Sequence, residues 1–222
     1  MQKSKICVSV ACEGLDAMHI DAQKAFKDGA DLIELRLDYL TSLDLESIKK
    51  KFRGFNGKII LTLRKKEEGG KFQGSESQRI SMLRQLQRWK GAYKDIELST
   101  LSDSKLKIDA KTIVSWHDFR STPSEKVLKE KLSAALEYGG MAKIVITAKK
   151  LSDNLAVLSL YNKKMKGKLV AFCMGEEGKI SRILAPMLGS PFMYACLEGA
   201  AVAPGQIPVS DLRGFYELLE IA

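Results

Sequence analysis

The stretch TPSEKVLKEKLSAALEYGGMAKIVITAK, residues 122–149, carries a helix signal followed directly by a strand signal. Its first part has a Thr suited to a helix N-cap, Pro at the next position, apolar residues at helical spacing and a closing Gly pair. Its last part, residues 143–149, is a short β-branched run of the kind found in buried strands. We therefore expect a helix that leads into a buried strand.

The same succession recurs along the whole chain. Segments with helical spacing, such as residues 75–91, separate eight apolar strand candidates. These candidates are residues 5–11, 31–40, 58–64, 94–99, 111–119, 143–149, 168–175 and 191–198. The fourth connection, around residues 101–109, is short and has room for only a turn of helix.

Strict alternation of strand and helix implies parallel strands joined by right-handed crossovers. Eight such units in 222 residues predict an α/β protein with a closed, eight-stranded parallel (β/α)8 barrel of the TIM type. An open doubly wound sheet is the alternative. ACEGLDAM, residues 11–18, lacks the G-x-G-x-x-G fingerprint, and no G-x-x-x-x-G-K-[ST] motif occurs. No linker divides the chain, so we expect one catalytic domain over residues 1–222.

Composition narrows the classes of partner. A hydrophobic content of 45% suffices for a sizeable core, and 36 Lys and Arg against 27 Asp and Glu give a net charge of +9. This charge favours anionic partners, which include nucleic acid, membrane surfaces and small acidic metabolites. The basic residues are spread out, mixed with acids and not interleaved with aromatic residues, so we expect solvated surfaces rather than a nucleic-acid site.

Targeting and metal signals are weak. The N-terminal MQKSKICVSVA has too short an apolar run for a signal peptide, and no segment reaches the roughly 20 apolar residues of a membrane span. We expect a cytoplasmic protein without a membrane partner. The four cysteines form no C-x-x-C pair and only two histidines are present, so we expect reduced core thiols and no zinc site.

Strand parity places charged residues inside the predicted barrel. Alternate strand residues point to opposite faces, so if Ile33 and Leu35 pack on helices, Glu34 and Arg36 project inward. Both lie near the C-terminal end of their strand, where barrel active sites lie. The same rule assigns these further residues to the interior: Thr62, Arg64, Glu97, Ser115, His117, Lys143, Val145 and Thr147.

This convergence favours a functional site. Burial of so many charges costs several kcal/mol per ion unless the groups pair or bind a ligand. Each residue also has a structural explanation. Glu34 and Arg36 suit a buried ion pair and His117 a hydrogen-bonded core imidazole, while Lys143 begins its strand candidate and must reach upward to the catalytic level.

Seven stretches carry a resemblance to one family. They are ELRLDYL (34–40), TLRKKEEGGKFQGSESQR (62–79), DIELS (95–99), IVSWHDF (113–119), KIVITAK (143–149), CMGEEGKISRILAPMLGSP (173–191) and APGQIPVSDLR (203–213). In these stretches, and in their order, the chain resembles the type I 3-dehydroquinate dehydratases. Those are lyases of the shikimate pathway that use a lysine Schiff base inside a (β/α)8 barrel. The resemblance covers nearly the whole chain.

The resemblance implies roles for individual residues. Lys143 corresponds to the amine that forms an imine with the substrate ketone, and His117 to the proton-transfer group. Glu97 matches an acid that orients that histidine. Glu34, Arg36 and Arg64 match groups that contact the ring hydroxyls, and Arg182 and Gln206 match groups that bind the carboxylate. Val202 stands where many members have Ser, which removes a hydroxyl contact.

The implied reaction is the dehydration of 3-dehydroquinate to 3-dehydroshikimate without a cofactor, and the resemblance also implies a homodimer. We expect residues 199–209, rich in small residues and Pro, to form a lid that carries Gln206, and residues 67–77 to form a second mobile loop. Two alternatives remain at this point. One is another Schiff-base barrel, an aldolase or transaldolase, and the other is a basic RNA-binding protein.

Overall fold

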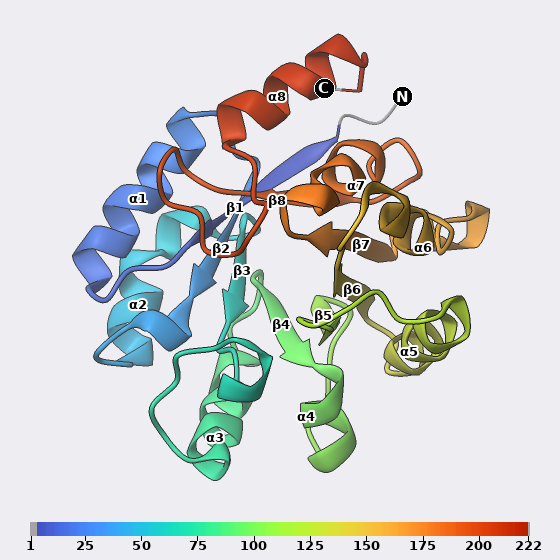
Figure 1. Cartoon of the computed structure of the whole chain (residues 1–222). Coiled ribbons are helices and arrows are strands. Elements are labelled where there is room, and N and C mark those ends of the chain that lie inside the picture. Colours follow the sequence, from blue (N-terminus) through green and yellow to red (C-terminus); the bar gives the residue numbers. More distant parts are fainter. Residues whose placement is uncertain (1–3, 222) are drawn as a thin grey trace.

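Strands and helices alternate along residues 4–221, the part of the chain that the computed structural model describes (Figure 1). The strands are β1 (Lys5–Val10), β2 (Leu32–Arg36), β3 (Ile59–Thr62), β4 (Tyr93–Glu97), β5 (Thr112–His117), β6 (Met141–Thr147), β7 (Leu169–Met174) and β8 (Phe192–Ala195). The α-helices are α1 (Leu15–Lys27), α2 (Leu45–Lys51), α3 (Glu76–Leu86), α4 (Leu98–Asp103), α5 (Glu125–Glu137), α6 (Asn154–Leu158), α7 (Lys179–Leu184) and α8 (Val209–Leu218). Every predicted strand is confirmed, and α4 is short as expected.

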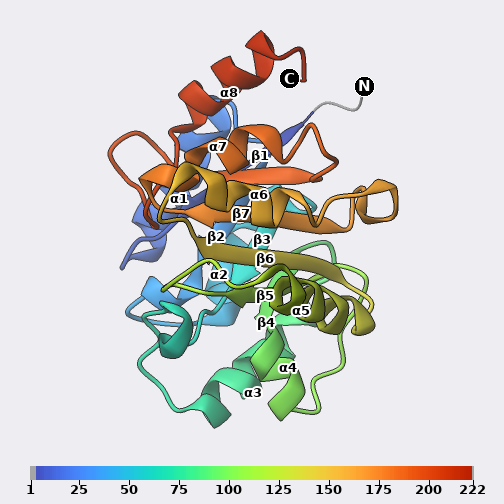
Figure 2. The same cartoon turned by 45° about the vertical axis from the view of Figure 1, so that its right-hand side comes forward.

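The eight strands form one parallel sheet in the order β7-β6-β5-β4-β3-β2-β1-β8. Each strand pairs with its sequence neighbour, and β1 also pairs with β8, where Cys7 lies opposite Tyr194. Within residues 4–221 no ladder joins β7 to β8, and the rings of Phe172 and Tyr194, 5.9 Å apart, span that gap. The helices surround the strands (Figures 1 and 2). The fold is therefore a nearly closed (β/α)8 barrel, and the open doubly wound sheet is excluded.

Side chains cap the starts of α2 and α3, whereas the start of α5 differs from the prediction. Ser75 caps α3 and forms a reciprocal capping box with Gln78. Helix α5 begins at Glu125 with Ser124 as its N-cap residue, not at the predicted Thr cap. Thr122 instead donates its hydroxyl proton to the carbonyl oxygen of Thr147, 3.0 Å away. The expected cap residue thus ties the loop after β5 to the end of β6.

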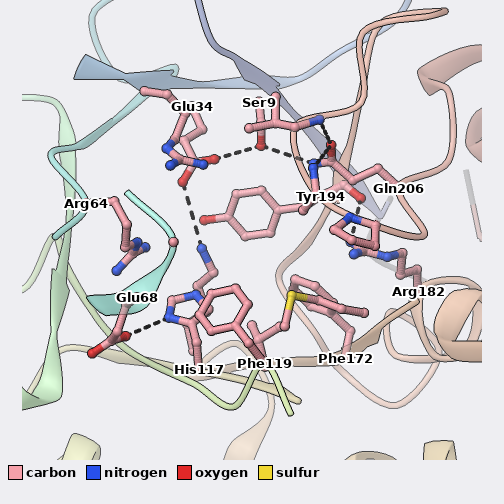
Figure 3. Close-up of a pocket in the computed structure, with 18 residues that line it drawn as sticks. Ser9, Glu34, Arg64, Glu68, His117, Phe119, Phe172, Arg182, Tyr194 and Gln206 are labelled. Atoms are coloured by element: carbon pink, nitrogen blue, oxygen red, sulfur yellow. Dashed lines mark hydrogen bonds and ion pairs between the residues drawn. The ribbon is translucent and has the colours of Figure 1, made fainter. Parts of the chain in front are cut away.

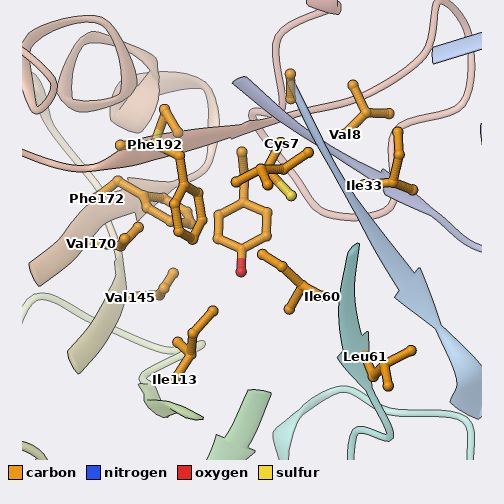
Figure 4. Packing of buried hydrophobic residues seen from close by; sticks show 14 of the residues in the cluster. Cys7, Val8, Ile33, Ile60, Leu61, Ile113, Val145, Val170, Phe172 and Phe192 are labelled. Atoms are coloured by element: carbon orange, nitrogen blue, oxygen red, sulfur yellow. The ribbon is translucent and has the colours of Figure 1, made fainter. Parts of the chain in front are cut away.

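The parity rule correctly separates the two faces of the strands. Ile33, Leu35, Ile144 and Ile146 are fully buried among the apolar side chains of the core. Inside the barrel, apolar side chains such as Ile60, Ile113, Val170 and Phe192 gather together (Figure 4). Glu34, Thr62, Asp95 and Ser115 are also buried, and they lie closer to the carboxyl ends of their strands than the apolar interior residues. The barrel thus has an apolar floor with a polar layer towards the strands' carboxyl ends.

Candidate active site

A cavity of about 120 Å³ opens at the carboxyl ends of the strands (Figure 3). A single buried water needs a cavity of only about 10–15 Å³, so this cavity can hold a small organic molecule. Seven of the eight predicted site residues line it: Glu34, Arg36, Arg64, His117, Lys143, Arg182 and Gln206. The eighth, Glu97, does not.

Lys143 lies inside this cavity with only 5% of its surface exposed. Strand β6 begins at Met141, so Lys143 is its third residue and sits higher in the barrel than expected. Its Nζ donates to Asp95 Oδ2 at 2.9 Å and lies 3.8 Å from Glu34 Oε1. The same nitrogen lies 4.1 Å from the centre of the Tyr194 ring. Lys143 is therefore a buried amine and not a strand-end lysine that reaches water.

Asp95 is a buried site residue that the sequence prediction missed. Its Oδ1 accepts from Arg64 Nη2 at 2.7 Å and from Ser115 Oγ at 2.6 Å, while Oδ2 faces Lys143. Burial alone would raise the pKa of Asp95, but Arg64 and Lys143 hold it well below its usual range. Asp95 has the same strand parity as Glu97, so the parity rule could have identified it.

His117 pairs with Glu68 rather than with Glu97. The His117 Nδ1 lies 2.9 Å from Glu68 Oε2, and the Phe119 ring stacks on the imidazole with 5.7 Å between centres. Burial first, then the charges of Arg64 and Lys143, lower the pKa of His117, and burial raises that of Glu68. The contact is therefore a hydrogen bond to a neutral ring, in which Nδ1–H donates to Glu68 and Nε2 keeps its lone pair.

The expected contact between Glu97 and His117 is wrong for a physical reason. Glu97 is buried and inward, but Arg79 of α3 donates to its Oε2 at 2.9 Å and Arg64 donates to its Oε1 at 3.1 Å. Both oxygens of the Glu97 carboxylate already accept hydrogen bonds from these two guanidinium groups and from the Lys65 N–H. Glu97 therefore anchors α3 and Arg64 to the barrel.

The loop after β3 places Glu68 at the cavity. Residues 66–68 form a short 3-10 turn that ends at Gly69, whose φ of +76° lies in the left-handed region. A Cβ on Gly70 would lie 2.0 Å from the Arg64 carbonyl oxygen, so only glycine allows the loop to pass this close. The segment was predicted as a mobile loop. Glu67 and Glu68, three and four residues after the inward-facing Arg64, were the available signal for a site acid.

Arg182 projects from α7 into the cavity and is almost fully buried. Its Nη1 donates to the Tyr194 carbonyl oxygen at 3.3 Å, and its guanidinium carbon lies 4.2 Å from the centre of the Phe172 ring. Nε and Nη2 have no hydrogen-bond partner among residues 4–221. Burial lowers the pKa of Arg182 to about 10. A buried guanidinium with free donors beside a cavity is suited to bind an anion.

Gln206 lies within the segment 199–209 and lines the same cavity. Its Oε1 accepts from the N–H groups of Val202 and Ala203 at 2.6 and 3.2 Å. Its Nε2 donates to Ser9 Oγ at 3.4 Å, and Ser9 Oγ in turn donates to Glu34 Oε2 at 2.7 Å. Gln206 thus links this segment to the barrel interior, and Val202 lines the cavity without a hydroxyl.

Arg36 and Arg64 differ in how many donors they keep for a ligand. Arg36 uses two N–H groups in a bidentate contact with Asp38, at 3.0 and 2.8 Å. Arg64 uses three, towards Glu97, Ser115 and Asp95. Since a guanidinium has five N–H donors, both side chains keep unused donors at the cavity.

Within the described residues, no group of three or more His, Cys, Asp or Glu side chains is arranged to hold a metal ion. Over the same part of the chain, no helix combines the length and apolarity that a membrane crossing requires.

A (β/α)8 barrel with a buried amine, an imidazole–carboxylate pair and a guanidinium with two free donors around one cavity belongs to the class of barrel enzymes with a covalent or acid–base site. Comparison with known proteins then gives the family. The sequence model of the "Type I 3-dehydroquinase" family matches residues 6–222. The chain belongs to the type I 3-dehydroquinase family.

Individual relatives agree with this assignment. A 3-dehydroquinate dehydratase of Methanococcus maripaludis strain C6 is 37% identical over 224 aligned residues, which cover 97% of this chain and 100% of the relative. The 3-dehydroquinate dehydratase of Methanocaldococcus jannaschii is 32% identical and covers 97% and 99%.

Solved structures show the same barrel. The crystal structure of 3-dehydroquinate dehydratase from Aquifex aeolicus VF5 superposes with a TM-score of 0.78 at 29% identity, over 96% of this chain and 98% of that chain. The enzyme from Geobacillus kaustophilus HTA426 gives a TM-score of 0.84 at 25% identity, over 98% and 91%.

Proposed function

We propose that this protein dehydrates 3-dehydroquinate to 3-dehydroshikimate through an imine formed by Lys143. Family membership makes the chain a 3-dehydroquinate dehydratase of the type I class, an enzyme of the shikimate pathway. The observation that carries the proposed mechanism is the position of the Lys143 amine. It is buried in the same cavity as the His117–Glu68 pair and Arg182, whose Nε and Nη2 have no hydrogen-bond partner among residues 4–221.

The imine solves the main chemical difficulty of the reaction. Loss of water requires removal of a proton from a carbon beside the ketone, and such carbon acids are weak. A protonated imine withdraws electrons from that carbon, so the carbanion is held as an enamine until the hydroxyl leaves. Attack on the ketone needs the amine without its proton. Asp95 stays ionised because its pKa is so low, and the neutral His117 ring is the base in the same cavity.

His117 then serves as the acid–base group. With Nδ1–H bound to Glu68, the Nε2 lone pair can take the proton from carbon and return one to the departing hydroxyl. Such proton transfer typically contributes about 10²- to 10⁴-fold in rate. Glu68 is thus the residue that we propose for the orienting role first expected of Glu97.

Substrate binding is assigned by charge. Arg182 offers two free donors on one edge of its guanidinium, which suit the substrate carboxylate, and Gln206 lines the same cavity. Glu34, Arg36 and Arg64 provide an acceptor and unused donors for the ring hydroxyls. Val202 has no hydroxyl to contact the carboxylate, so we assign carboxylate binding to Arg182 and Gln206.

The oxygen of the product ketone tests this mechanism. An imine route expels the ketone oxygen as water and regains it by hydrolysis, so turnover in ¹⁸O-water should give 3-dehydroshikimate labelled at the ketone. A direct elimination leaves that oxygen unlabelled, and an aldolase would instead cleave a C–C bond and open the ring without loss of water. Mass spectrometry of the product, with an enzyme-free control for background exchange, distinguishes the three. Unlabelled product would contradict the imine.

A further inference from the structure

The ring of Tyr194 forms one wall of the space around the Lys143 nitrogen. Tyr194 lies on β8, is 2% exposed, and occupies the centre of the cavity residues in Figure 3. Its ring centre is 4.1 Å from Lys143 Nζ, well within the range of a cation–π contact. We propose that Tyr194 is a positioning residue whose π face stabilises the positively charged nitrogen of the Lys143 imine. This inference rests on the proposed function.

The ring is held rigidly. Phe192, two residues earlier on the same strand, meets it edge-on with 5.4 Å between ring centres, and Phe172 of β7 lies tilted at 5.9 Å. Arg182 binds the Tyr194 carbonyl oxygen. The ring therefore presents a fixed face to the nitrogen and needs no reorganisation when charge develops there.

The hydroxyl of Tyr194 makes no comparable contribution. Its Oη is buried and has no hydrogen-bond partner among residues 4–221. Burial first, and then the nearby charge of Glu34, raises the pKa of the phenol, so the group stays neutral and cannot act as a base. What Tyr194 supplies to Lys143 is its aromatic face.

The chemistry of the lysine nitrogen explains why this face matters. A protonated amine has three N–H donors, whereas the protonated imine that forms when the amine joins the ketone carbon and water leaves has one. That single N–H can satisfy Asp95, but Glu34 then loses a partner on the nitrogen. Attraction between a cation and a ring quadrupole does not depend on an N–H, so it is kept when the protonated amine becomes the protonated imine.

Three variants distinguish the effect of the Tyr194 ring on catalysis from its effect on packing. In each, kcat is divided by the number of active sites, measured as the amount of Lys143 that borohydride traps. Tyr194→Leu should lose about 10-fold in kcat, the size expected for a desolvated cation–π contact, with KM within about twofold because Arg182 and Gln206 are intact. Tyr194→Phe, which keeps the ring, should restore most of that loss. Phe52→Leu removes a buried ring that packs on His19 and Phe55, away from the cavity, so it should lower Tm without changing kcat per trapped site.

A graded series tests the ring even if Tyr194→Leu fails to fold. Phenylalanine with one, two or three ring fluorines at position 194 keeps the shape and weakens the negative face stepwise, so kcat should fall with each fluorine at constant Tm. Equal kcat across the series, or a Tyr194→Leu enzyme with wild-type kcat per trapped site, would overturn the inference. No borohydride adduct in the wild-type enzyme would instead overturn the proposed function, and this inference with it.

Discussion

At the scale of single residues, the site is defined by which carboxylate pairs with each cation or with the histidine ring. Asp95 pairs with Arg64 and Lys143. Glu97 pairs with Arg64 and Arg79, and Glu68 pairs with His117. Sequence parity correctly placed Glu97 in the interior but could not show its partner, because Arg79 arrives from helix α3. Partner choice within a charged cluster depends on side-chain directions that only the assembled barrel fixes.

The histidine pair gives a prediction at this scale. Glu68→Gln should lower kcat by roughly 10- to 100-fold, because no carboxylate remains to stabilise the imidazolium formed during proton transfer. Glu97→Gln is the matched control, and it should lower Tm while it leaves His117 paired to Glu68. Steady-state kinetics and thermal melts distinguish the two. A larger kcat loss in Glu97→Gln than in Glu68→Gln would restore the original assignment.

The pH profile provides a second readout of the same pair. In the proposed mechanism His117 acts as a base when neutral, and burial, Arg64 and Lys143 lower its pKa. A lowered pKa keeps the ring neutral further into the acid range, so the acid limb of kcat/KM should lie below pH 6.5, about the ordinary value of histidine. An acid limb above that value would contradict the buried, neutral ring.

At the scale of structural elements, loops at the carboxyl ends of the strands carry much of the site. The turn of residues 66–68 brings in Glu68, α7 brings in Arg182, and the 199–209 segment brings in Gln206. The sequence predicted the last of these as a lid and residues 67–77 as a mobile loop, and both motions stay predictions. Glu68 was missed because loop residues have no parity from which their direction can be deduced.

Gly70 tests the role of the first loop. In Gly70→Ala the new Cβ would meet the Arg64 and Lys65 carbonyl oxygens at 2.0 and 2.7 Å, so the backbone must move and displace Glu68. We expect kcat to fall by about 10-fold or more, since a shift of about 1 Å in a catalytic group can cost up to 10²-fold. Gly54→Ala, where nothing lies within 4 Å, is the control and should keep wild-type kcat. Equal kinetics in both variants would show that the close approach does not position Glu68.

At the scale of the whole molecule, the alternating pattern of the sequence was sufficient to predict the barrel. All eight strands lie within or overlap the predicted ranges, since β-branched runs and helical spacing are local signals that the fold does not override. The interior network was only partly predictable. Ser9, Asp95 and Tyr194 are inward residues of predicted strands, but their importance becomes visible only when β1, β4 and β8 are brought next to Lys143.

The buried network should also govern acid stability. Asp95 has a folded-state pKa below its unfolded value, so it contributes stability above about pH 3.9 that is lost as pH falls further. Asp95→Asn leaves Arg64 and Lys143 without their shared carboxylate and should cost about 3–5 kcal/mol at neutral pH, with a weaker dependence on acid. Asp44→Asn, at an exposed N-cap, is the surface control. Urea unfolding between pH 2 and 7 measures the stability of both variants, and equal stability of the two would contradict the network's role.

We propose that Lys143 forms the covalent intermediate, and borohydride reduction in the presence of 3-dehydroquinate can trap that bond. Reduction should fix a stable adduct of substrate or product on the peptide that contains Lys143, found by peptide mass mapping. The adduct should be absent in Lys143→Ala, and His117→Ala should still form it although turnover is nearly lost. An unmodified Lys143 in an active enzyme, or an adduct on another lysine, would contradict the account.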